Sequence, residues 1–144
     1  MRALRILVVD DHAMVRSRLC SLLRTRPEFE VVSEASDGLQ AVEMARALQP
    51  DVVVLDISMP SMGGIEAAPQ IRQGAPGAQI LFVSQHNSLS VVREALSTGA
   101  RGYVVKSDAS ADLVEAVFAV SQGIEFVSRK LVYNSPNSQP SATS

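Results

Sequence analysis

The sequence contains no tryptophan, one cysteine and few aromatic residues, and each scarcity argues against a class of protein. Aromatic residues make up 4% of the chain, which disfavours both the base-stacking surfaces of single-stranded nucleic-acid binders and a flavin-stacking pocket. Cys20 has no partner for an internal disulfide and lies within a helical pattern. We therefore interpret it as a buried structural residue and not as a reactive thiol.

Long apolar runs and a strong net charge are also missing. No run approaches the roughly 18 apolar residues that span a bilayer, and residues 1–5 lead into a strand-like run without the features of a signal peptide. The formal net charge of -2 does not suit a stand-alone DNA-binding domain, which is usually basic. We expect one cytoplasmic domain without a membrane partner.

Short apolar runs alternate with amphipathic patterns along the chain. The runs are unbroken and rich in β-branched residues, which is typical of parallel strands covered on both faces. They cover 6–9, 31–32, 52–55, 80–83 and 103–105. Helical spacing of apolar residues follows each run, at 15–23, 41–48, 65–71, 89–96 and 113–120. This order predicts an α/β fold, a doubly wound (βα)5 parallel five-stranded sheet with the flavodoxin-like order 2-1-3-4-5.

Helix boundaries are predicted from proline, glycine and capping residues. The expected helix ends are at Pro27, Gln49-Pro50, Gly99 and Gly123. Ser110 is expected to be the N-cap of the fifth helix. Pro69 interrupts the third helical pattern, so we expect a kink there or a helix that begins late enough to place Pro69 in its first turn.

The domain boundary is predicted at Gly123. We assign residues 1–123 to the folded domain and residues 124–144 to a C-terminal extension. Within this extension, residues 124–127 are expected to pack on the domain as a short segment. Residues 134–144 contain no apolar residue larger than alanine, which indicates a linker or disordered tail.

Polar and charged residues end four of the predicted strands, at the edge where parallel α/β sheets bind ligands. Asp10 and Asp11 end the first strand, Asp56 the third, Ser84 the fourth and Lys106 the fifth. Three neighbouring carboxylates repel one another unless a cation lies among them, and a set of oxygen ligands favours Mg²⁺ over zinc. We therefore predict a magnesium site at this edge.

The same residues suit phosphoryl transfer. A carboxylate accepts a phosphoryl group as an acyl phosphate, and we interpret Asp56 as this nucleophile. Lys106 supplies positive charge and Ser84 a hydrogen bond to the phosphoryl oxygens. Taken singly, the aspartates are also compatible with helix caps or turns, Lys106 with a solvated charge and Ser84 with a loop residue. Their coincidence at four strand ends favours one site.

The two histidines lie next to this set but have no second nitrogen or sulfur ligand nearby in sequence. A transition-metal site at His12 or His86 is therefore not expected. His86 is predicted to lie close to the phosphoryl position, where it either modulates access of water or is an exposed loop residue.

Four segments together resemble the receiver domain of two-component response regulators. They are LVVDDH at 7–12, DISMPSMGG at 56–64, VS at 83–84 and GYVVKS at 102–107. The likeness covers roughly residues 4 to 123, and ALSTGARGY at 95–103 favours the FixJ/LuxR-type subgroup of transcriptional regulators. The resemblance implies a phosphorylation switch that assists only its own phosphorylation and dephosphorylation, and not an enzyme.

The resemblance also implies specific roles. Asp56 accepts a phosphoryl group from a phosphohistidine on a sensor histidine kinase. Mg²⁺ is bound directly by Asp11, Asp56 and the backbone carbonyl of Ser58, and by Asp10 through bound water. Ser84 and Lys106 contact the phosphoryl oxygens.

Three further features follow from the same resemblance. Tyr103 is the aromatic switch, which turns inward as the hydroxyl at the end of the fourth strand is drawn to the phosphate. The resulting change reaches the face made by the fourth helix, fifth strand and fifth helix, including Arg93 and Arg101. The peptide bond after Lys106 is expected to be cis, although Ser107 is not proline and a cis bond there would cost about 3 kcal/mol.

The resemblance also implies partners, and the sequence leaves two alternative functions open. A homodimer is expected through the face of the fourth helix, fifth strand and fifth helix, or through the first and fifth helices. DNA is expected to bind only through a C-terminal helix-turn-helix domain absent from these 144 residues. One alternative is a haloacid-dehalogenase-like phosphatase, but such enzymes need an acidic residue at the position of Ser58. The other is a phosphate-independent receiver that acts by protein–protein interaction.

Overall fold

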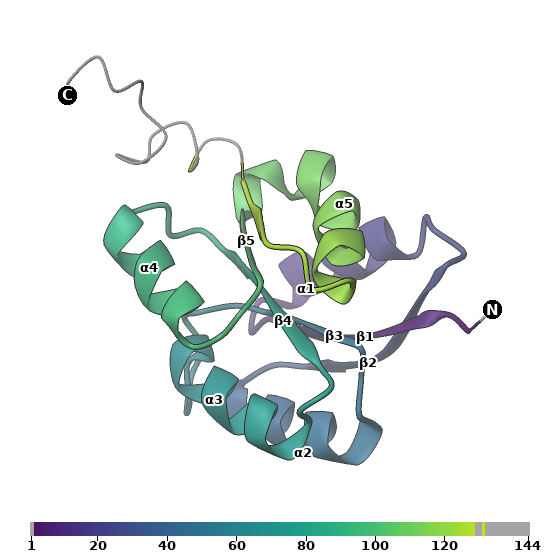
Figure 1. Ribbon diagram of the computed structural model, residues 1–144, viewed down its shortest axis with the longest axis horizontal. Helices are drawn as coiled ribbons and strands as arrows, with labels where there is room; N and C mark the ends of the chain where they lie inside the picture. The colour runs from purple at the N-terminus through teal and green to yellow at the C-terminus, as the bar shows by residue number, and fades with distance from the viewer. Residues whose placement is uncertain (1, 129–130, 132–144) are drawn as a thin grey trace.

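The computed structural model describes residues 2–128 and residue 131, and these form a parallel β-sheet with helices on both faces (Figure 1). The strands are β1 (Leu4–Val9), β2 (Phe29–Ala35), β3 (Val52–Leu55), β4 (Gln79–Ser84), β5 (Gly102–Val105) and β6 (Phe126–Val127). Their order, β2-β1-β3-β4-β5-β6, confirms the predicted 2-1-3-4-5 arrangement and adds a sixth strand at the β5 edge.

Five α-helices connect the strands. They are α1 (Ala13–Leu23), α2 (Gly38–Leu48), α3 (Gly64–Gly74), α4 (Leu89–Ser97) and α5 (Ala109–Ser121), and a short 3₁₀ helix, η1 (Lys106–Asp108), precedes α5. In the part of the chain that the structure describes, no helix combines the length and apolar character needed to cross a membrane.

The core consists of two apolar layers, one on each face of the sheet. In β3, Val53 and Leu55 contribute to the layer that includes α2, α3 and α4, whereas Val52 and Val54 contribute to the layer that includes α1 and α5. Figure 1 shows α2 and α3 on one side of the sheet and α1 and α5 on the other. Burial on both faces explains why the strands read as unbroken apolar runs.

Most helix ends agree with the breaker residues. Helix α2 ends before Gln49, which has a left-handed φ of 49°, and α4 ends shortly before Gly99, whose φ of 96° suits glycine. Helix α5 likewise ends before Gly123. Helix α1, however, already ends at Leu23, so Pro27 follows the helix end and does not set it.

Three local expectations were wrong. Helix α5 begins at Ala109 because η1 leads directly into it, so Ser110 lies in the first turn and is not the N-cap. Of the two alternatives for the third helix, the late start is wrong: Pro69 lies inside α3, where its missing N–H leaves the carbonyl of Ile65 without its i+4 donor. The other alternative, a kink at Pro69, stays a prediction. The peptide bond between Lys106 and Ser107 is trans, as the cost of a cis bond before a residue other than proline favours.

The C-terminal extension is partly described. Residues 124–127, expected to pack on the domain, include β6, which pairs in parallel with β5 through the partners Gly102–Phe126 and Tyr103–Val127. The predicted linker or disordered tail over 134–144 lies outside the described residues.

Glycines at the start of α3 allow the loop after β3 to fold tightly beneath Asp56. The backbone N–H of Gly64 donates to the carbonyl of Ile57 at 2.8 Å. A Cβ atom at Gly64 would collide with the backbone carbonyl of Asp56, and one at Gly63 would lie 2.7 Å from the carbonyl oxygen of Ile57. The absence of side chains at these positions therefore fixes the loop next to Asp56.

We expect Gly64→Ala to lower the free energy of unfolding by about 2 kcal/mol, because the added methyl group overlaps backbone atoms that cannot rotate away. Urea unfolding measures this loss. Gly77→Ala is the matched control, since a Cβ there has no neighbour within 4 Å and should change stability little. Equal stability losses in the two variants would contradict the close packing described for Gly64.

Candidate functional site

The carboxyl ends of β1, β3 and β5 bring two buried carboxylates and one ammonium into contact. The Nζ atom of Lys106 lies 2.8 Å from Asp10 Oδ2 and 3.1 Å from Asp56 Oδ2. The other oxygen of Asp56, Oδ1, accepts a hydrogen bond from its neighbour's backbone N–H, that of Ile57, at 2.7 Å. Asp56 lies 50 positions before Lys106 in the chain. The two residues, together with Asp10, nevertheless share one pocket because parallel strands end at the same edge of the sheet.

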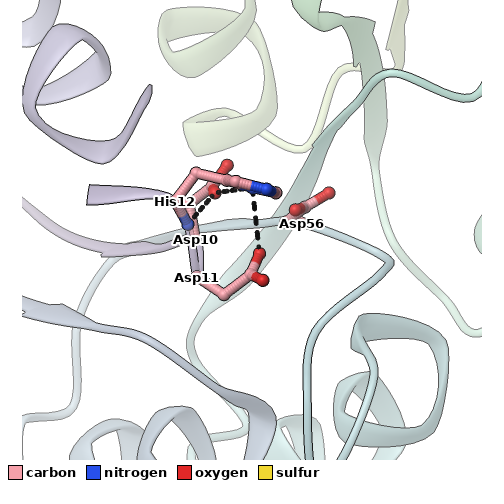
Figure 2. Close-up of side chains that lie close together, drawn as sticks. All are labelled: Asp10, Asp11, His12 and Asp56. Carbon is pink, nitrogen blue, oxygen red and sulfur yellow. Dashed lines mark hydrogen bonds and ion pairs between the residues drawn. The ribbon is translucent and has the colours of Figure 1, made fainter. Parts of the chain in front are cut away.

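Acidic groups gather at this edge together with an imidazole. Figure 2 shows the side chains of Asp10, Asp11, His12 and Asp56 directed toward one another, and one ligand atom from each lies within 4.8 Å of all the others. Among the described residues, no hydrogen bond reaches the buried atoms Asp10 Oδ2 and Asp11 Oδ1. Lys106 Nζ lies 2.8 Å from Asp10 Oδ2, and His12 Nδ1 lies 3.2 Å from Asp11 Oδ1.

This donor set fits a hard divalent cation. Carboxylate oxygens are the ligands that Mg²⁺ prefers, and a cation among them would satisfy oxygens that otherwise lack hydrogen-bond donors. The residues predicted for the metal, Asp10, Asp11 and Asp56, are brought together. Ser58, predicted to contribute its backbone carbonyl, lies in the loop that follows β3, and its role stays a prediction.

His12 belongs to this group, although sequence reasoning did not assign it to the site. Its Nδ1 atom lies 3.4 Å from Asp10 Oδ1 and 3.2 Å from Asp11 Oδ1, and its backbone N–H donates to Asp10 Oδ1 at 2.9 Å. His12 also occupies the N-cap position of α1, so neither aspartate is the helix cap. The signal was its position directly after the acidic pair.

Arg16 is a second residue that sequence reasoning missed. It donates from Nη1 to the backbone carbonyl of Asp10 at 2.7 Å and from Nε to Glu34 Oε1 at 3.1 Å. It therefore ties the loop after β1 to β2. The sequence indicated only that Arg16 belongs to the polar face of α1. Its contact with the backbone carbonyl of Asp10 could not be predicted, because a backbone atom has no residue-specific signal.

Burial and neighbouring charges act in opposite directions on the two central groups. Burial raises the pKa of Asp56; Lys106 lowers it and Asp10 raises it, and the net pKa is above the usual value. Burial lowers the pKa of Lys106, but its close contact with Asp10 and the charges of Asp56 and Asp10 outweigh burial, so this pKa is raised. Lys106 is therefore firmly cationic, and ionised Asp56 depends on nearby positive charge.

His86 connects the remaining predicted residues. Its backbone N–H donates to Ser84 Oγ at 3.2 Å, its carbonyl accepts from the Tyr103 hydroxyl at 2.7 Å, and its Nε2 atom lies 2.8 Å from Ser58 Oγ. His86 is half-buried and thus more than an exposed loop residue. Two of these three contacts use backbone atoms, so the identity of the side chain could not have predicted them.

Tyr103 is fully buried, in the inward orientation that the resemblance assigns to the phosphorylated state. Burial raises the pKa of Tyr103, and the Ser84 hydroxyl opposes this shift. The ring also lies 6.3 Å from that of Phe82, measured between centroids. The tyrosine thus links the apolar layer under α4 to the loop that follows Ser84.

Comparisons with known proteins agree with this geometry. The family described as the response regulator receiver domain matches residues 6–118. The transcriptional regulatory protein DegU of Brevibacillus brevis is 38% identical over 131 residues, which cover 91% of this chain and 56% of DegU. The nitrate/nitrite response regulator NarL of Escherichia coli K12 is 36% identical over 126 residues, covering 88% of this chain and 58% of NarL.

A solved structure is similar over most of its length. The crystal structure of a LuxR-family two-component response regulator from Aurantimonas sp. SI85-9A1 has a TM-score of 0.85 and 40% identity, covering 90% of this chain and 92% of the other. The chain spans only 56% and 58% of the two curated relatives named above. With the family match over residues 6–118, the chain belongs to the response regulator receiver domains, which are phosphorylation switches and not enzymes.

Proposed function

We propose that the chain accepts a phosphoryl group on Asp56 from a phosphohistidine of a sensor histidine kinase and thereby switches an output. The observation that carries this proposal is the contact of one ammonium, Lys106 Nζ, with two buried carboxylates beside Asp11. Three carboxylates and one ammonium leave an excess of negative charge in a small space. Such a site suits a divalent cation and an incoming phosphoryl group whose charge the cations neutralise.

The reaction forms one bond and breaks another. An oxygen of the Asp56 carboxylate attacks the phosphorus atom, the P–N bond to the kinase histidine breaks, and the bonding electron pair remains on the imidazole nitrogen, which then takes up a proton. The Ile57 N–H positions Asp56 by donating to its Oδ1 atom. Lys106 contacts the other carboxylate oxygen, so its ammonium is close enough to pair with a phosphoryl oxygen. Ser84 supplies a hydrogen bond to another of these oxygens.

Mg²⁺ supplies charge neutralisation for the transferred group. Asp11, Asp56 and the Ser58 carbonyl would hold it, with Asp10 acting through water. Asp10 has a further task, because it binds Lys106 and accepts the backbone N–H of His12. It therefore keeps the ammonium at the pocket even when Asp56 carries a phosphoryl group.

The switch is electrostatic. The phosphoryl group carries about −1.5 to −2 charges, and it replaces the single negative charge of the Asp56 carboxylate. Ser84 and Lys106 thereby gain a more strongly charged partner. The loop that contains His86 joins Ser84 to Tyr103, so movement of Ser84 reaches the tyrosine through two hydrogen bonds. The phosphate then favours one of two existing arrangements of the face formed by α4, β5 and α5.

The output is expected to involve partners of the whole protein. A homodimer would use the α4–β5–α5 face, where Arg93 and Arg101 are exposed, or the pair α1 and α5. The curated relatives named above are transcriptional or nitrate/nitrite response regulators, which supports transcription as the output. DNA would be bound through a C-terminal domain beyond the receiver, and the protein would act in the cytoplasm.

Asp56→Asn should abolish phosphorylation by acetyl phosphate and Mg²⁺, because the amide cannot form the acyl phosphate. Intact-protein mass spectrometry should find one added phosphoryl group on the wild type and none on this variant. Asp37→Asn is the control: Asp37 caps α2 by accepting from Gln40 N–H at 2.9 Å, and asparagine caps equally well. An unlabelled wild type would favour the phosphate-independent alternative.

Mg²⁺ should stabilise the wild type and lose this effect in Asp11→Asn, because an amide at position 11 weakens the cation site. At ten times Kd the gain should be about 1.4 kcal/mol, measured by thermal unfolding with and without the ion. Asp37→Asn should respond like the wild type. If Asp11→Asn gains as much as the wild type, the cation does not bind where we place it.

Asp56→Asn should also raise the free energy of unfolding at neutral pH without divalent ions, by about 1 kcal/mol. Burial and Asp10 raise the pKa of Asp56 in the folded state despite Lys106, so folding favours the protonated carboxyl. The contribution of Asp56 to stability is therefore most favourable below the carboxyl's unfolded-state pKa and is lost as pH rises through the raised folded-state pKa.

Urea unfolding in chelator at neutral pH, and again near the ordinary carboxyl pKa, measures this difference. The advantage of the asparagine variant should shrink as pH falls, since asparagine does not titrate. A constant advantage at both pH values would show that burial of charge is not its cause.

A further inference from the structure

The segment after α5 runs beside β5 and bonds to residues next to the switch (Figure 1). We call residues 124–128 and Leu131 the C-terminal strap. The N–H of Phe126 donates to the carbonyl of Arg101 at 3.0 Å, and that of Ser128 donates to the carbonyl of Tyr103 at 2.9 Å. Ser128 Oγ then accepts from the N–H of Val105 at 2.9 Å.

The strap is part of both apolar layers. Leu131 is 4% exposed and belongs to the core cluster that contains Tyr103, and Ser128 is fully buried. Phe126 packs against the opposite cluster, which includes α5. A Cβ atom at Gly102 would lie 3.0 Å from the carbonyl oxygen of Phe126, so the strap leaves no room for a side chain at this position of β5.

Tyr103 is consequently held from two directions. Its hydroxyl donates to the carbonyl of His86, in the loop that follows Ser84, and its own carbonyl accepts from Ser128 in the strap. The next bond of the strap, from Val105 N–H to Ser128 Oγ, is one residue before Lys106, which contacts Asp56. The strap therefore binds the backbone of β5 at Tyr103 and at Val105, the residue before Lys106.

We propose that docking of the strap on β5 and phosphorylation of Asp56 favour each other, so that the strap is the element that transmits the state of the site toward the C-terminal part of the chain. This inference rests on the proposed function. The sign of the coupling follows from the structure, in which the docked strap and the inward Tyr103 occur together. A state that needs Tyr103 inside is stabilised by a strap bound to the same residue.

A second consequence concerns the α4–β5–α5 face. The edge of β5 is already paired with β6 of the same chain. A second copy that used this face would contact α4, α5 and the strap, and would add no strand to β5. The strap thereby protects an edge that would otherwise expose unpaired N–H and carbonyl groups.

The test compares the wild type with Ser128→Ala and with Ser33→Ala, using the full chain, Mg²⁺ and beryllofluoride as the phosphoryl mimic. Ser128→Ala removes the acceptor of the Val105 N–H but touches no residue of the pocket. Ser33→Ala is the matched control for Ser128→Ala. It also removes a serine hydroxyl, which contacts Met44 Sδ, but it does so at the opposite, β2 edge of the sheet. NMR gives the affinity for the mimic, and hydrogen exchange gives the protection of the Phe126 and Ser128 amides.

Beryllofluoride should slow exchange of these two amides in the wild type, and Ser128→Ala should lower the affinity for the mimic at least fivefold. Ser33→Ala should bind it like the wild type. Shifts near Asp56 with unchanged or faster exchange in the strap overturn the inference, whatever the variants do. No shift near Asp56 or Lys106 in the wild type overturns the proposed function together with the inference, so the two failures are distinguishable.

Discussion

The contact of Lys106 with Asp10 and Asp56 is the interaction on which the site depends. Burying a charge is expensive, and removing one member of a buried ion pair typically costs about 3–5 kcal/mol because the partner is left uncompensated. Here one ammonium contacts two carboxylates that follow different strands. The ends of β1, β3 and β5 are therefore held together by these ion pairs as well as by the hydrogen bonds of the sheet. The shared lysine leaves the pocket with surplus negative charge, because Asp11 adds a third carboxylate beside it. That surplus makes the pocket receptive to a divalent cation.

In the proposed switch, the same arrangement would carry the effect of a local reaction to a distant face. Lys106 begins with two partners, and a phosphoryl group on Asp56 would offer a third with more charge. Asp10 retains its bond to the ammonium, so Lys106 can reorient without leaving the pocket. Movement of the Ser84 hydroxyl would reach Tyr103 through His86. The backbone N–H of His86 is bonded to Ser84, and its backbone carbonyl is bonded to the Tyr103 hydroxyl. A residue joined at both ends transmits displacement because it has little freedom to absorb it.

Much of the fold was predictable because its strands are buried on both faces and its helices are amphipathic; strand ends then indicated which side chains meet. The errors arose where structure depends on contacts without a periodic pattern. Strand β6 has two residues and no periodicity of its own, and it forms because β5 offers unpaired backbone groups. Ser110 resembled a cap, but η1 and Ala109 begin the helical conformation before it. His12, Arg16 and His86 act largely through contacts with backbone atoms or with the acidic pair, and their side-chain types alone do not reveal such contacts.

Ser128 shows why the C-terminal strap belongs to the receiver fold and is more than a connection. Beyond Val127, β6 ends, yet the N–H of Val105 still faces the strap and would be a buried donor without an acceptor. Such a group costs about 1–3 kcal/mol when unsatisfied. The serine hydroxyl supplies the acceptor in place of a backbone carbonyl, while its N–H continues the pairing with Tyr103. Two bonds from one residue thus close the edge of β5 at the position just before Lys106. The strand that carries Tyr103 and leads into Lys106 is therefore completed on its outer edge by the C-terminal segment.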